Sequence, residues 1–205
     1  MDHSAYENGK GQYIYGRMDA RSIGRSPTAQ AYRVFGPSQV PVDHPTERFL
    51  SMKTVESVLE TLGITLPQAQ RPVAAYVPVR MAGGLAFVSG QVPMKDGQLV
   101  ASGSVPSSVS VDAATAAARV CAINALAALK AALEGDLDRI AGIVRVGVFV
   151  ASDAGFFGQP AIADGVSTLL VDVFGESGRH ARAAVGSVAL PLGATVEVEM
   201  IVELR

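Results

Sequence analysis

An arginine stands among small side chains in the C-terminal part of the chain. Arg182 lies in the segment His180–Gly186 (HARAAVG), where a strand is expected to begin. Its small neighbours leave room around the guanidinium, whose fork of N–H donors can bind a carboxylate bidentately. Arg182 is therefore a candidate anion-binding residue. The residues alone also allow a strand-end arginine that pairs with an acid or faces water.

Two glutamates follow in an alternating segment. Glu197 and Glu199 lie two residues apart, so they point to the same side of a strand. One carboxylate of such a pair could hold a water molecule or move a proton. The same spacing is also typical of the exposed face of an edge strand, and the sequence leaves both interpretations open.

Metal and covalent chemistry have little support. The three histidines show no metal-ligand spacing, and His180 is expected in a loop between a helix and a strand. The single cysteine, Cys121, lies on the apolar stripe of an expected helix, where an inert core thiol is the natural interpretation. Nucleophile-elbow, P-loop and dinucleotide-binding motifs are absent from the sequence. We therefore expect no metal and no cofactor.

One further short motif could approach a ligand. Ser89-Gly90-Gln91 stands at the end of an expected strand. A glycine in that position allows the backbone to come close to a bound molecule, although an ordinary turn has the same composition.

Regular patterns from Met52 onward define the elements that must position these groups. Apolar residues recur at helical spacing in three segments, each followed by a glycine, and β-branched runs mark the strands. The expected helices are 54–62, 111–133 and 160–174, the expected strands are 73–79, 85–89, 143–150, 183–189 and 195–204, and a hairpin is expected around Lys95-Asp96-Gly97.

This order of elements predicts an α+β fold. Strands separated by helices require crossover connections and some parallel pairing, which gives a mixed sheet with two helices packed on one face. The remaining residues offer no second amphipathic layer for the opposite face. We therefore expect subunits to associate through it.

Composition narrows the class of protein. The chain has 205 residues with a formal net charge of −2, which argues against nucleic acid as the main partner. The most apolar stretch, 120–133, is interrupted by Asn124 and Lys130 and is shorter than a membrane span. One cysteine and no recognisable signal peptide favour a cytoplasmic protein.

The chain changes character near Met52. Residues 1–51 are expected to form a poorly ordered extension, because they are dotted with Gly, Ser, Pro and Arg and show no helical or strand period. A genuine extension and a translation start at Met52 both agree with this pattern. Residues 52–205 are expected to form the folded domain.

Three segments together resemble a known family. They are residues 88–93 (VSGQVP), residues 178–186 (GRHARAAVG) and the ending that runs from Leu190-Pro191 to Val196-Glu197-Val198-Glu199. In this order and spacing they resemble the RidA family, also called YjgF, over about residues 52–205. The resemblance implies a chorismate-mutase-like fold and a homotrimer with a central barrel-like core and sites in the clefts between subunits.

The resemblance also implies an activity: hydrolysis of reactive 2-enamine or 2-imine acids, such as 2-aminoacrylate, to 2-keto acids and ammonia. Arg182 matches the family arginine that binds the substrate carboxylate. Glu197 matches the glutamate that positions the attacking water, helped by a backbone carbonyl near Ala184. Tyr76 and Ser89 match residues that line the pocket, together with Gly90. An iminium carbon is already electrophilic, so no metal or covalent nucleophile is required.

The chain departs from the shorter family members. It adds the 52–62 helix and the N-terminal extension, which indicates a longer subgroup. The family asparagine on the second helix has no clear match; Asp164 or Ser167 could stand there, and Ser167 is included among the expected binding residues.

Two other functions keep the same fold. A non-catalytic protein could bind or sense a small carboxylate in the same cleft. A chorismate-mutase-like enzyme would need further cationic groups near Arg182, and nothing in the sequence places Arg80, Arg119 or Arg145 there. The RNA cleavage attached to some family members is disfavoured, because residues 52–205 carry 11 basic and 14 acidic residues.

Overall fold

The computed structural model describes residues 5–8, 12–15, 54–69 and 75–205, in two units, Met1–Arg48 and Phe49–Arg205. In the first unit, β1 (Ala5–Asn8) pairs antiparallel with β2 (Gln12–Tyr15). No strand was expected in this region from its sequence. Tyrosine and isoleucine favour strands, and the Gly-Lys-Gly that separates the two in the sequence is typical of a hairpin connection.

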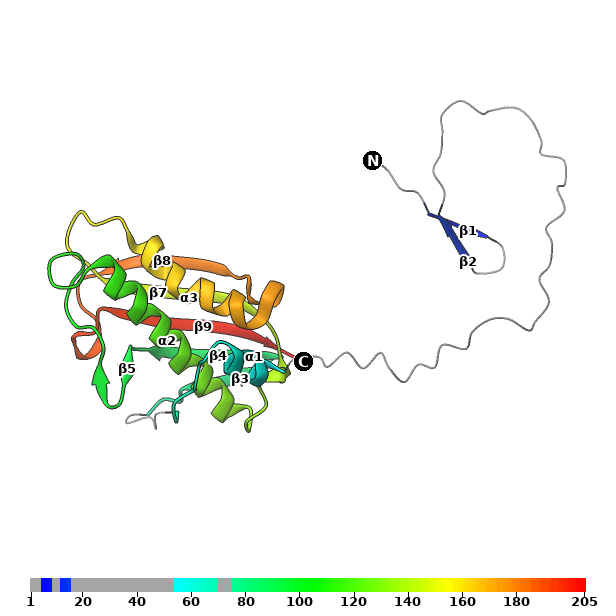
Figure 1. Cartoon of the computed structure of the whole chain (residues 1–205), viewed down its shortest axis with the longest axis horizontal. Coiled ribbons are helices and arrows are strands. Elements are labelled where there is room, and N and C mark those ends of the chain that lie inside the picture. Colours follow the sequence, from blue (N-terminus) through cyan, green and yellow to red (C-terminus); the bar gives the residue numbers. More distant parts are fainter. Residues whose placement is uncertain (1–4, 9–11, 16–53, 70–74) are drawn as a thin grey trace, which may run out of the picture. The chain divides into compact units, whose positions relative to one another are not determined.

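The second unit is built on a mixed sheet with the strand order β3-β4-β9-β7-β8 (Figure 1). β7 pairs parallel with β8, and the other neighbours are antiparallel. The sheet strands are β3 (Val79–Ala82), β4 (Leu85–Gln91), β7 (Ile140–Ala151), β8 (Ala181–Ser187) and β9 (Val196–Leu204), the hairpin strands are β5 (Met94–Lys95) and β6 (Gln98–Leu99), and the helices are α1 (Val55–Thr61), α2 (Val111–Ala132) and α3 (Gln159–Phe174). The predicted α+β fold is confirmed.

Helices α2 and α3 run side by side over one face of the sheet (Figure 1). The buried stripe of α2 is composed largely of alanine, with Ala114, Ala118 and Ala125 fully buried beside Cys121. Small side chains let the helix lie close to β9, whose Val196, Val198, Met200 and Val202 are also buried. The alternation predicted for this last strand is therefore confirmed.

The helix that contains most of the apolar stretch 120–133 is longer than that stretch. Helix α2 has 22 residues and is long and apolar enough to cross a membrane by length and composition alone. In the fold it is instead the central core helix. Its two interrupting polar residues make specific contacts, since Asn124 donates to the carbonyls of Val92 and Met94 and Lys130 pairs with Glu56.

The expected strand over 73–79 is wrong in its described part. Residues 73 and 74 lie outside the described residues, and β3 begins only at Val79. Pro78 has no N–H to give to a ladder, and its carbonyl accepts from the backbone N–H of Ser89 at 2.9 Å. Before Val79 the chain therefore contacts β4 through this backbone hydrogen bond, but it is a loop and not a strand.

The other face of the sheet has no helix over it within the described residues. Glu197 and Glu199 lie on this face, and so do Phe87 and Val185, which are 41% and 46% exposed. We call it the open face. Apolar side chains left exposed on a sheet face are consistent with burial against another copy.

Candidate functional site

The predicted site residues fall into two groups on different parts of the sheet. Ser89, Gly90 and Glu197 form the first, the β4–β9 group, with Tyr76 nearby. Ser167, Arg182 and Ala184 form the second, the α3–β8 group.

The β4–β9 group is built around an irregularity in β4. The ladder between β4 and β9 shifts register between Val88 and Gln91. Within the shifted stretch, Ser89 Oγ donates to the carbonyl of Val77 at 2.7 Å, which ties β4 to the segment after Tyr76. Tyr76 is 54% exposed. The group therefore presents a serine hydroxyl, a tyrosine and a carboxylate at one end of the sheet.

Gly90 lies directly against the Glu197 side chain. A Cβ at this position would lie 1.8 Å from Oε1 of Glu197. Gly147 makes similar room for Glu199, since its Cβ would lie 2.8 Å from that side chain. Both glutamates thus lie flat against glycine backbone, and a larger side chain at either glycine would displace the glutamate beside it.

The two glutamates differ in their surroundings. Glu199 accepts a hydrogen bond from Arg145 Nη1 at 2.9 Å. Glu197 forms no ion pair within the part of the chain that the structure describes. Partial burial raises the pKa of Glu197, and the neighbouring Glu199 charge raises this pKa further. Glu197 therefore holds a proton more readily than an ordinary surface glutamate.

We expect Glu197→Gln to raise the stability of the fold near pH 7. The pKa of Glu197 in the folded protein is raised above the ordinary value of 4.5. Ionising Glu197 therefore costs more in the folded protein than in the unfolded chain, and wild type loses stability as the pH rises from about 4.5 through the folded-state pKa. Glutamine does not ionise, so Glu197→Gln does not lose stability in this way. Because the side chain is only half-buried, the gain should be a few degrees in Tm at most, and it should disappear at about pH 4.

Thermal unfolding at both pH values measures this difference, with Glu203→Gln as the matched control, since Glu203 is exposed on the same strand. A Glu197→Gln variant less stable than wild type at neutral pH would contradict the argument.

The α3–β8 group is a hydrogen-bonded network around Arg182. Its Nη1 donates to Asp164 Oδ1 at 2.7 Å and to Ser167 Oγ at 3.0 Å. His180 Nδ1 lies 2.7 Å from the carbonyl of Gly178, which can only accept, so Nδ1 carries a proton. In the neutral ring Nε2 then accepts from Ser167 Oγ, 3.1 Å away. The serine hydroxyl is thereby oriented with its lone pairs toward Arg182.

Arg182 keeps part of its donor capacity. Its side chain is 25% exposed, and among the described residues its Nε and Nη2 donate to no partner. These two nitrogens lie along one edge of the planar guanidinium, the edge that binds a carboxylate bidentately. Ala184, two residues along β8, is half-buried against the core and keeps the strand surface low beside this edge.

The two groups lie on opposite faces of the sheet. Arg182 is opposite Val146 in the parallel ladder, and Val146 is fully buried on the helix side. Glu197 is opposite Phe149, three residues further along β7 and hence on the open face. One protomer therefore does not place the guanidinium and this carboxylate in the same cavity.

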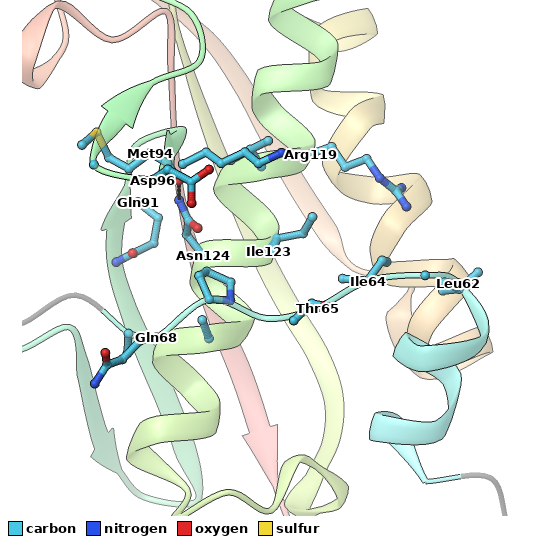
Figure 2. Close-up of a pocket in the computed structure, with 17 residues that line it drawn as sticks. Leu62, Ile64, Thr65, Gln68, Gln91, Met94, Asp96, Arg119, Ile123 and Asn124 are labelled. Atoms are coloured by element: carbon cyan, nitrogen blue, oxygen red, sulfur yellow. Dashed lines mark hydrogen bonds between the residues drawn. The ribbon is translucent and has the colours of Figure 1, made fainter.

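A cavity of about 820 Å³ lies elsewhere, between the loop after α1, the β5–β6 hairpin and α2. Figure 2 shows Gln91, Met94 and Asp96 on the hairpin side and Ile64 and Thr65 on the loop side. Ile123 and Asn124 of α2 stand between them. None of the predicted site residues lines this cavity. Of the Ser89-Gly90-Gln91 motif, only Gln91 lines it. No pattern in the sequence indicates the cavity itself.

Asp164 and His180 belong to the Arg182 network, which was not expected from the sequence. Asp164 and Ser167 are three residues apart on α3, so they share a helix face. That spacing could have indicated a joint partner for an arginine on the neighbouring strand. Among the described residues, no cluster of three His, Cys, Asp or Glu side chains gathers as metal ligands do.

Comparison with known proteins adds a family. Residues 56–204 match the family described as "YjgF/chorismate_mutase-like, putative endoribonuclease". Protein TCP17 of Trypanosoma cruzi is 45% identical over 152 residues, which cover 74% of this chain and 94% of that protein.

Two solved structures are similar over the same share of this chain. A protein of unknown function from Agrobacterium tumefaciens has 46% identity and a TM-score of 0.69, with 74% of this chain and 92% of that chain covered. A protein from Shewanella oneidensis, described as a "putative endoribonuclease", has 34% identity and a TM-score of 0.71, with 74% and 99% covered.

Proposed function

The chain belongs to the YjgF/chorismate mutase-like family, and on that premise we propose that it hydrolyses 2-enamine or 2-imine acids of the 2-aminoacrylate type. The products would be a 2-keto acid and ammonia. An enamine first takes a proton on its terminal carbon and releases one from its nitrogen, which gives the imine. Water then adds to the imine carbon, the carbon–nitrogen bond breaks, and the nitrogen leaves as ammonia. The reaction requires a carboxylate anchor, a positioned water and a group that transfers the water proton.

The observation that supports this function best is the free edge of Arg182. Asp164 and Ser167 hold one end of the guanidinium and leave Nε and Nη2 for a ligand. A guanidinium held in this way has fewer conformations to lose when it binds a carboxylate. We assign it the role of substrate anchor.

Glu197 suits the second role. A carboxylate without a cation partner, whose pKa is raised by burial and by Glu199, is a better proton acceptor than an ordinary surface glutamate. It would take a proton from the attacking water and return it to the departing nitrogen. Ser89 and Tyr76, in the same group, would line the pocket.

We further propose that the two groups meet only between protomers. A site that needs both Arg182 and Glu197 must combine one protomer's helix side with another's open face, because each protomer carries them on opposite faces. A homotrimer with sites between subunits provides such an arrangement, and burial of Phe87 and Val185 would favour it.

The single buried cysteine is compatible with a cytoplasmic location.

A coupled assay tests the activity. A pyridoxal-phosphate lyase supplied with serine generates 2-aminoacrylate, and the release of pyruvate is followed with and without the protein. Acceleration above the spontaneous rate is expected. No acceleration by folded protein would favour the alternative, a protein that only binds small carboxylates.

We expect Gly90→Ala to reduce turnover by about a hundredfold, because a catalytic group displaced by about 1 Å can lose that much. The added methyl group would overlap Glu197 Oε1 and force that carboxylate away. Gly142→Ala on β7 is the matched control, since its Cβ would come no closer than 3.4 Å to another atom. Near-wild-type turnover of folded Gly90→Ala would refute the role of this close contact.

RNA cleavage is the second candidate, because the family description and the Shewanella relative carry the word endoribonuclease. The charge of this chain works against it. A protein with a net charge of −2 gains little from the phosphate contacts that supply most affinity for RNA. Incubating the same preparation with RNA separates the two functions.

A further inference from the structure

The partner of Arg182 is itself a carboxylate with access to solvent. Asp164 Oδ1 lies 2.7 Å from Arg182 Nη1, and the Asp164 side chain is 65% exposed. The first Lys or Arg after Asp164 in the sequence is Arg179, and it is already paired with Glu176. A negative charge therefore stands beside the edge where a substrate carboxylate would bind.

We propose that Asp164 makes this site selective for acids with a single carboxylate. The inference rests on the proposed function, because it assumes that the substrate carboxylate occupies the free edge of Arg182. It adds the substrate class: 2-imine acids with neutral or cationic side chains are favoured, and those with a second carboxylate are disfavoured.

Repulsion between carboxylates would let Asp164 distinguish substrates with one carboxylate from those with two. A carboxylate bound at Nε and Nη2 would share one guanidinium with Asp164, which holds Nη1. Charges on two sides of the same side chain interact even in a solvated site. Every substrate has the first carboxylate, so its repulsion by Asp164 cancels when two substrates are compared. Only a second carboxylate adds a difference.

Ser167 and His180 allow this charge to be removed without releasing the guanidinium. Ser167 accepts from the same Nη1, and His180 orients its hydroxyl. In Asp164→Asn the amide oxygen can still accept the hydrogen bond from Arg182, so the variant changes charge and little else. We therefore expect the anchor to stay in place.

The test compares two keto acids that mimic the products. Binding of 2-oxobutyrate, with one carboxylate, and 2-oxoglutarate, with two, is measured by calorimetry on the full chain. Wild type should prefer 2-oxobutyrate. In Asp164→Asn that preference should fall by about threefold to tenfold, the lower part of the Coulomb range because Asp164 is exposed.

Asp172→Asn is the matched control. Asp172 is exposed on the same helix, about 12 Å further along its axis, so its removal should leave the preference unchanged. Added salt should reduce the preference in wild type and in the control, and should reduce it less in Asp164→Asn, where Glu197 is the remaining carboxylate of the proposed site.

The outcomes separate this inference from the proposed activity. An unchanged preference in Asp164→Asn overturns the selectivity even if imine hydrolysis is observed. Binding with the expected preference but without turnover overturns the activity and leaves the selectivity standing. Failure of wild type to bind either keto acid overturns the carboxylate anchor, and the selectivity with it.

Discussion

Arg182→Ala is expected to reduce kcat/KM for imine hydrolysis by about a hundredfold to ten-thousandfold. The variant loses two charge-assisted hydrogen bonds to the substrate carboxylate, each worth roughly 1.5–3 kcal/mol. It also leaves Asp164 without its cation, so the remaining charge repels the substrate. The coupled pyruvate assay measures the loss.

Two controls make the result specific to the anchor. Arg179→Ala removes an exposed guanidinium three residues earlier, whose partner is Glu176, and should leave turnover unchanged. Arg182→Lys keeps the charge but lacks the planar fork, so it should recover only part of the lost rate. Turnover of folded Arg182→Ala close to that of wild type would refute the assigned role.

Much of the fold could be predicted because its elements have strong periodic signals. The alanine stripe of α2 and the strict alternation of β9 each allow only one face to be buried. Glycines mark the helix ends, and Gly175 indeed follows α3 with a positive φ of 61°. Local patterns of this kind do not depend on distant contacts.

The start of β3 and the hairpin β1–β2 were not predicted. Residues 73–79 are apolar enough for a strand, but Pro78 and the hydroxyl of Ser89 redirect the backbone before Val79. That outcome depends on a partner 12 residues away. The early hairpin is short, and its signal was obscured by the glycines and charges around it.

The candidate residues could be named from the sequence, but their placement on opposite faces of the sheet could not be predicted from it. Arg182 and Glu197 stand on neighbouring segments of the sequence, and residue types alone suggest that they share a cavity. Their faces are set by ladder register with β7, in which Val146 and Phe149 are the respective partners. Register is a property of pairing between distant strands, so it becomes visible only in the structure.

This separation leads to a second large effect. Arg182→Ala and Glu197→Gln should each be nearly inactive as pure proteins, since a general base contributes about a hundredfold to ten-thousandfold. Mixed oligomers of the two, made by co-expression or by refolding an equal mixture, should regain activity. The expected level is about a quarter of wild type.

The quarter follows from random assembly. A site between protomers is intact when the subunit that supplies the arginine is the Glu197→Gln variant and the subunit that supplies the glutamate is the Arg182→Ala variant. Each condition holds about half the time, whatever the number of subunits in a closed ring.

Mixing Arg182→Ala with Arg182→Lys provides the control, because no combination of these chains restores the native arginine. A site contained within one protomer would give no recovery in the first mixture, since every chain lacks one of the two groups. Recovery near a quarter would therefore establish both that the oligomer exists and that its active site draws on opposite faces of two sheets.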